Sequence, residues 1–184
     1  TAGGSEEHSQ AFNEDVTITN DVTFGAIGAV TIGTADDDVA TFTGGVDVTA
    51  ATGTVTLAGA INTTDTAMDF GAVELADGTT FDSGDGAAGT IVVGDITTGT
   101  NEVSFDSGST AGATIDVGEI ADLTGGLTLV DAGGLATFGA LGQGTTGDIT
   151  VTDSSAGVTF GGAVTATTLT LTDTTAGEDI TFQG

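Results

Sequence analysis

The side chains in this sequence that could do chemistry are almost all carboxylates. The 184 residues include 27 aspartates and glutamates and one histidine, but no lysine, arginine or cysteine. One set of aspartates follows similar alternating strands at the same distance: Asp131, Asp153 and Asp173. A second set, Asp82 and Asp106, shares the sequence Phe-Asp-Ser-Gly. Because calcium prefers oxygen ligands such as these carboxylates, we expect calcium as the cofactor and these residues as its ligands.

A third group of candidate calcium ligands is the run Asp36, Asp37 and Asp38. If repeats stack equivalent aspartates about 5 Å apart, their like charges repel, so either their acidity shifts or a cation lies between them. The alternative is that aspartates at turns accept hydrogen bonds from the backbone and otherwise face water, which is their common role. Both interpretations place the aspartates in turns.

The composition argues against several other kinds of chemistry. With a formal charge of −27 and no lysine or arginine, the chain lacks the donors that bind phosphate, so we expect no nucleic acid partner. No apolar run approaches the roughly 18 residues of a membrane span, so we expect no direct insertion into a membrane. The one histidine, His8, has no cysteine or lysine to act with. We therefore expect no enzymatic activity and no catalytic residue.

Short alternating strands must position the carboxylates. Apolar residues alternate with threonine in many segments, which is the pattern of a strand with one buried face. Examples are the segments 16–18, 30–32, 127–129, 149–151 and 169–171. Phenylalanine marks a repeat that contains these strands, and Phe138, Phe160 and Phe182 are each 22 residues apart. The repeat therefore contains three short strands joined by turns rich in glycine, aspartate, threonine and serine.

Three strands in about 22 residues cannot bury a face alone, so successive repeats must stack, with each strand parallel to its counterpart one turn away. The sequence predicts an all-β fold, a parallel β-helix or β-solenoid, over residues 16–184. We expect phenylalanine and aliphatic side chains to fill the interior, the phenylalanine marker to recur in register, and threonine to face water. The main alternative is a β-sandwich, which would have hairpin turns and irregular strand spacing.

Repeats rich in glycine, threonine and alanine extend to the end of the sequence, as in Gly-Gly-Ala-Val-Thr-Ala-Thr-Thr-Leu-Thr-Leu at 161–171. On these repeats, residues 16–184 resemble the β-helical passenger and stalk regions of secreted bacterial surface proteins of the filamentous-haemagglutinin and autotransporter type. The resemblance implies a structural or adhesive role outside the cell. It carries over no catalytic residue.

The two ends of the sequence differ from its middle. Residues 1–15 are polar and do not fit the repeat, so we expect an N-terminal extension in which Phe12 could insert into another copy. Residues 180–184 fit the repeat but carry no polar cap, and an uncapped solenoid end exposes strand edges and apolar side chains. We therefore predict that copies of the chain are partners, through an interface formed by Phe12, Val16, Ile18, Ile180 and Phe182.

These features predict a secreted structural protein, a subunit of an extracellular fibre or surface layer whose copies join head to tail. Because the sequence begins with Thr1, we expect secretion with removal of an N-terminal segment, and a fragment of a larger protein fits equally well. Calcium would screen or bridge the aspartates and permit assembly. One alternative is a stalk segment of a large bacterial adhesin, whose glycan or surface ligand the residues do not identify. A second is an ice-binding solenoid, because Thr-x-Thr strands could order water.

Overall fold

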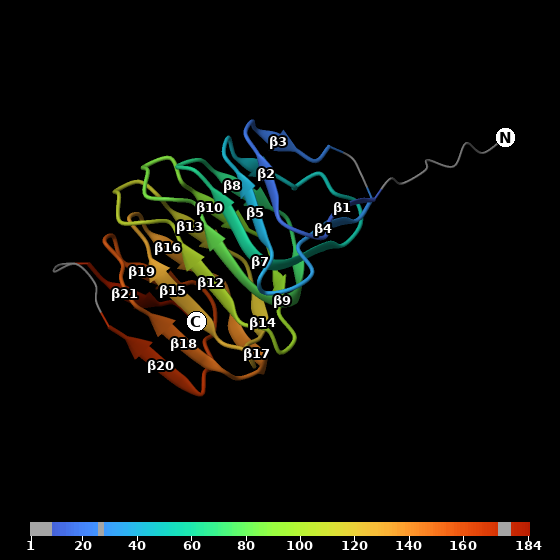
Figure 1. Ribbon diagram of the computed structural model, residues 1–184. Helices are drawn as coiled ribbons and strands as arrows, with labels where there is room; N and C mark the ends of the chain where they lie inside the picture. Colours follow the sequence, from blue (N-terminus) through green and yellow to red (C-terminus); the bar gives the residue numbers. More distant parts are fainter. Residues whose placement is uncertain (1–8, 26–27, 173–177) are drawn as a thin grey trace.

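The computed structural model describes residues 9–25, 28–172 and 178–184, which form 21 β-strands and no helix. The strands wind into a parallel β-solenoid of eight turns with three faces. Every strand pair formed by these residues is parallel. Figure 1 shows the strands of successive turns side by side, from the blue N-terminal end to the red C-terminal end. The predicted β-solenoid is confirmed, and a β-sandwich is excluded.

The first two faces meet at a corner that β7 and β9 cross without a break. The first face contains β1 (Gln10–Phe12), β4 (Val30–Ile32), the first parts of β7 (Val55–Thr63) and β9 (Val73–Asp82), β11 (Ile96–Thr97), β14 (Ile120–Asp122) and β17 (Leu141–Thr145). The second face contains β2 (Val16–Ile18), β5 (Val39–Phe42), the second parts of β7 and β9, β12 (Val103–Asp106), β15 (Leu127–Asp131), β18 (Asp148–Val151) and β20 (Thr168–Leu171). A bridge from Leu141 to Val164 extends the first face into the last turn.

The third face is a separate sheet of eight strands. It contains β3 (Val22–Thr23), β6 (Val46–Asp47), β8 (Met68–Phe70), β10 (Ile91–Val93), β13 (Ile115–Val117), β16 (Ala136–Phe138), β19 (Val158–Phe160) and β21 (Ile180–Phe182). Strand pairs join residues 22 positions apart in the last turns, as Ala136, Val158 and Ile180 illustrate. Elsewhere the separation differs by a few residues, for example between Val55 and Val73. The turns absorb these differences, so the strands remain in register.

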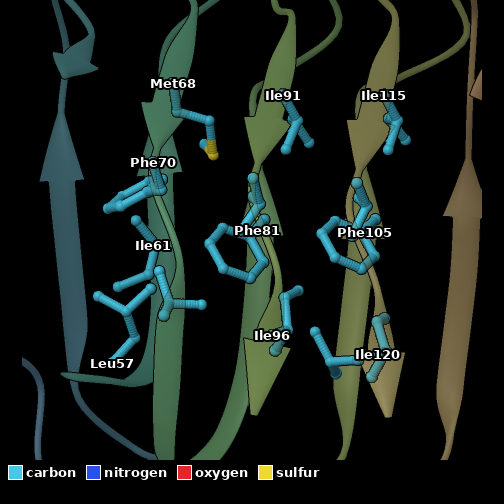
Figure 2. Close-up of a cluster of buried hydrophobic side chains, with 14 of the residues drawn as sticks. Leu57, Ile61, Met68, Phe70, Phe81, Ile91, Ile96, Phe105, Ile115 and Ile120 are labelled. Carbon is cyan, nitrogen blue, oxygen red and sulfur yellow. The ribbon is translucent and has the colours of Figure 1, made fainter. Parts of the chain in front are cut away.

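The core consists of apolar side chains that point inward from all three faces. Figure 2 shows equivalent residues of neighbouring turns lying in rows, such as Met68, Ile91 and Ile115 on the third face. Residues between two inward positions are more exposed, as Thr31 is between buried Val30 and Ile32 in β4. This burial follows the period of two that a strand imposes on its side chains. The expected apolar interior and threonine-bearing outer surface are confirmed.

Six of the nine phenylalanines form one aromatic stack, but they do not recur at one position of the turn. Phe81 and Phe105 lie on the second face, whereas Phe70 and Phe138 lie on the third. Their rings nevertheless contact one another in sequence from Phe70 to Phe182, with centroid distances of 5.0 to 5.9 Å. The prediction of a phenylalanine marker in register is therefore confirmed within each face, for Phe81 and Phe105 and for Phe138, Phe160 and Phe182, but it is wrong between the two faces. Inward positions of different faces meet in the same interior, so either face can supply the ring.

The solenoid begins within the segment expected to be an N-terminal extension. Residues of β1 pair in parallel with β4, from Gln10 beside Val30 to Phe12 beside Ile32. Phe12 also packs edge to face against Phe24 of the third face, with ring centroids 6.0 Å apart. This contact fixes β1 as the first strand of the first turn.

Candidate functional site

Four of the predicted calcium ligands lie in one column at the end of the second face. Asp82 pairs with Asp106, and Asp106 pairs with Asp131 across a β-bulge at the end of β15. Asp153 follows β18 and acts electrostatically on Asp131. The two sets of aspartates that were distinguished in the sequence therefore contribute to a single row, called the acidic column below, which contains Asp82, Asp106, Asp131 and Asp153. Asp173, which was predicted to continue it, lies outside the described residues.

The sequence Asp-Ser-Gly explains how this corner is built. Asp82 and Asp106 face outward, and each accepts a hydrogen bond through Oδ1 from the backbone N–H of the glycine two residues later, at 2.8 and 2.9 Å. The serine that follows each aspartate, Ser83 or Ser107, points inward and is fully buried. Ser83 donates its hydroxyl to the carbonyl of Gly89, and Ser107 donates to that of Ala113 at 3.0 Å. At these two positions the aspartates stabilise turns, as the alternative interpretation expected.

Asp131 has a different environment from the other members of the acidic column. Alanine rather than serine follows it, and its Oδ1 is buried without a hydrogen-bond partner among the described residues. Burial raises the pKa of Asp131, and the carboxylates of Asp153 and Asp106 raise it further. Burial also raises the pKa of Asp106, while the N–H of Gly108 opposes the rise. The column therefore concentrates like charges whose ionisation is disfavoured at the centre.

The run 36–38 does not join the acidic column, because it lies in the turn between β4 and β5. Oδ2 of Asp38 accepts hydrogen bonds from the backbone N–H of Thr34 at 2.7 Å and of Ala35 at 3.1 Å. The bond from Thr34 is the main reason why the pKa of Asp38 is below its ordinary value. Asp36 and Asp37 are exposed. Asp36 lines an open surface cavity of about 410 Å³ together with Asp77 and Glu102.

A pair of aspartates on the third face was not singled out from the sequence. Asp47 and Asp69 are neighbours in register on β6 and β8. Burial, and then the charge of Asp47, raises the pKa of Asp69. The hydroxyl and the N–H of Thr49 both donate to Asp47, at 2.7 and 2.9 Å, and lower its pKa. The sequence offered little indication that these two aspartates are neighbours, because they share no flanking motif: Asp47 follows valine and Asp69 follows methionine. Within the described ranges, no three metal-ligating side chains converge on one point.

The residues of the predicted assembly interface lie at the two ends of the solenoid. Phe12, Val16 and Ile18 belong to the first turn and pack partly buried against the core. Ile180 and Phe182 belong to the last turn. All five therefore lie on the first or the last turn, at positions where a neighbouring turn is present on one side only.

The last turn exposes apolar side chains that equivalent turns bury. Phe182 is 51% exposed, whereas Phe160, its neighbour in register, is fully buried. Leu169 and Leu171 are 36% and 43% exposed, while their partners on β18 are buried. An open cavity of about 310 Å³ lies among these side chains, lined by Gly162, Val164, Ala166, Leu169, Phe182 and Gly184. The prediction omitted Leu169 and Leu171, although their alternation matches that of the buried strands.

Hydroxyl groups form a second regular column on the outer surface. The pairing of β9, β12, β15, β18 and β20 places five outward residues in register over five turns. They are Thr80, Ser104, Thr128, Thr150 and Thr170. The segments 91–93 and 115–117 have valine and aspartate where other strands have threonine, but they belong to the third face. They therefore do not interrupt this column, which lies on the second face.

Comparison of the chain with protein-family models, with curated proteins and with solved structures found no match. A search of the described residues for a helix long and apolar enough to cross a membrane also found none.

Proposed function

We propose that this protein is an extracellular structural protein, a subunit that lengthens a fibre or surface layer by stacking end to end. The single observation that carries the proposal is the open apolar surface of the last turn, formed by Leu169, Leu171 and Phe182. Monomeric soluble proteins rarely leave a contiguous apolar surface at a sheet edge, because it is a template for another chain. The extracellular location is supported by the resemblance to passenger and stalk regions of secreted bacterial proteins.

We include calcium in the proposal as the condition for assembly. Each copy carries a formal charge of −27, so copies repel one another at low ionic strength. Divalent cations would screen this repulsion and would bind the carboxylates of the acidic column, where Asp106 and Asp131 lie among like charges. Because Asp82 and Asp106 are also engaged with backbone N–H groups, we expect such binding to be weak.

Negative-stain electron microscopy of the purified chain tests this proposal. One sample is kept at low salt with a chelator, and the other contains millimolar calcium. We expect short single rods in the first sample and filaments in the second. Single rods in both samples would contradict self-assembly. Filaments in both would support assembly and remove calcium from the proposal.

A stalk segment of a large adhesin is the alternative for the same open surface. In that case a further turn of the same polypeptide covers Leu169, Leu171 and Phe182, and the 184-residue chain stays monomeric in calcium and salt. Sedimentation of the chain at increasing concentration separates the two proposals, since only a self-assembling subunit sediments faster as its concentration rises.

Ice binding is a second candidate, favoured by the hydroxyl column of the second face. Parallel strands place the column's members about 4.8 Å apart, which is a regular array for ordered water. Thermal hysteresis of the purified protein is the test. A Thr150→Leu variant should reduce it, while Thr23→Leu on the third face serves as the control. Absence of hysteresis in the unmodified protein would contradict this candidate.

A further inference from the structure

We infer that copies stack head to tail in register, with β20 and β21 of one copy pairing in parallel with β2 and β3 of the next. This inference rests on the proposed function and adds the partner strands, their polarity and their register. It assumes that two copies pair in the same way as successive turns already pair within the chain. On the third face, each strand pairs with the equivalent strand of the next turn. The partner is therefore a second copy of this chain.

The third face defines the register. Its first inward column runs through every strand, from Val22 in β3 to Ile180 in β21. The two end strands carry similar residues, since Val-Thr-Phe at 22–24 matches Ile-Thr-Phe at 180–182. Continuing the column places Ile180 beside Val22 and Phe182 beside Phe24 of the next copy. There Phe182 would continue the aromatic stack that it already makes with Phe160.

The second face agrees with this register. One inward column contains Val16, Ala40, Ile61, Phe81, Phe105, Leu129, Val151 and Leu171. Continuing it places the exposed side chain of Leu171 beside Val16, which is only partly buried in the first turn. The same stacking operation therefore covers apolar side chains on two faces at once.

The polarity follows from the parallel pairing. A head-to-tail contact repeats the geometry that exists inside the chain, and because it joins two different surfaces it leaves an open end on each assembly. A contact between two last turns would instead join identical surfaces and stop at a dimer. Acidic residues lie at both ends of the solenoid, among them Asp15 and Asp21 in the first turn and Asp179 in the last, and all three are exposed. Their mutual repulsion explains why assembly would depend on cations.

Cysteine cross-linking tests the register directly, because the sequence contains no cysteine. Thr23 and Thr181 are outward residues that the register places side by side in neighbouring copies. Adjacent parallel strands lie about 4.8 Å apart, within the roughly 4.4–6.8 Å between Cα atoms that a disulfide allows. Oxidation of the double variant Thr23→Cys/Thr181→Cys in calcium should give a ladder of disulfide-linked multimers on a non-reducing gel.

Two controls make the cross-linking result specific. Thr17→Cys/Thr181→Cys pairs residues of different faces and should give at most a tenth of the multimers. Thr181→Cys alone should run as a monomer on the non-reducing gel, and a disulfide-linked dimer would show contact between last turns and overturn the inference. Filaments of Thr23→Cys/Thr181→Cys without cross-links would overturn the register but leave the proposed function standing. Monomers of every variant and of the unmodified chain, seen by electron microscopy in calcium, would overturn both.

Discussion

The fifth and the eighth turns of this solenoid both carry apolar side chains, including a phenylalanine, at inward positions, but they differ in what surrounds them. Phe105 in β12 lies between Phe81 and Phe138 and is fully buried, with ring centroids 5.2 and 5.8 Å away. Phe182 in β21 is half exposed, and among the described residues its ring stacks on one other ring, that of Phe160. In a solenoid, burial therefore depends on the neighbouring turns as much as on the side chain itself. A turn with one neighbour retains apolar surface that can bind another turn.

The largest expected effect is a difference between two truncations of phenylalanine. Phe105→Ala should lower the free energy of unfolding by about 3–5 kcal/mol, because it leaves a cavity in the aromatic stack. Phe182→Ala should lower it by about 1 kcal/mol or less, because half of that ring is already in water. Urea unfolding at low salt with chelator, where copies are separate, measures both values. Equal losses would mean that the last turn is as buried as the fifth, contrary to this comparison.

A glycine between the seventh and eighth turns tests how the last turn is held. Gly142 has a φ of +68°, and a Cβ there would lie 1.9 Å from the carbonyl oxygen of Thr165 in the last turn. Gly142→Ala should therefore cost about 1–3 kcal/mol and separate the last turn from the seventh. Gly71→Ala is the matched control, because no atom lies within 4 Å of the Cβ it adds. Hydrogen exchange of residues 168–171 should accelerate only in Gly142→Ala, and unchanged exchange would argue against the tight contact.

The acidic column should give a smaller, pH-dependent effect. Asp106 and Asp131 have pKa values above the ordinary 3.8, so the folded chain binds their protons at a pH where the unfolded chain has lost them. Their contribution to stability therefore increases as pH falls from 7 through the raised pKa values and levels off below 3.8. Asp131→Asn should stabilise the fold at pH 7 by less than about 1 kcal/mol, since solvent screens the partly exposed charges.

The matched control for the acidic column is Asp37→Asn, which removes the same charge from an exposed turn. Thermal unfolding of both variants between pH 3 and 7 should show that Asp131→Asn gains less stability than Asp37→Asn as pH falls from 7. The pKa values of Asp38 and Asp47 are lowered, so these two residues contribute a pH dependence of the opposite sign. Both variants retain them, so their contribution cancels in the comparison. Identical pH profiles would contradict the raised pKa of Asp131 in the folded chain.

The sequence was sufficient to predict the strands and their parallel stacking, because alternation and a repeat of about 22 residues are local properties. It could not predict which aspartates share a column. The bulge beside Val130 shifts Asp131 by one position, so Asp106 and Asp131 come into register although their flanking sequences differ. Nor could it reveal that the phenylalanines change faces, because spacing alone does not distinguish inward positions of the second face from those of the third.

The most direct test of the central claim is sedimentation velocity in millimolar calcium over a range of concentrations, with two charge-adding variants of the last turn. Phe182→Asp places a carboxylate on the open apolar surface, whereas Thr181→Asp places the same charge one residue earlier on the outward side of β21. We predict that the unmodified chain and Thr181→Asp sediment faster as concentration rises, and that Phe182→Asp remains a monomer. An unmodified chain that stays monomeric, or a Phe182→Asp variant that still assembles, would contradict the claim that this surface joins copies of the protein.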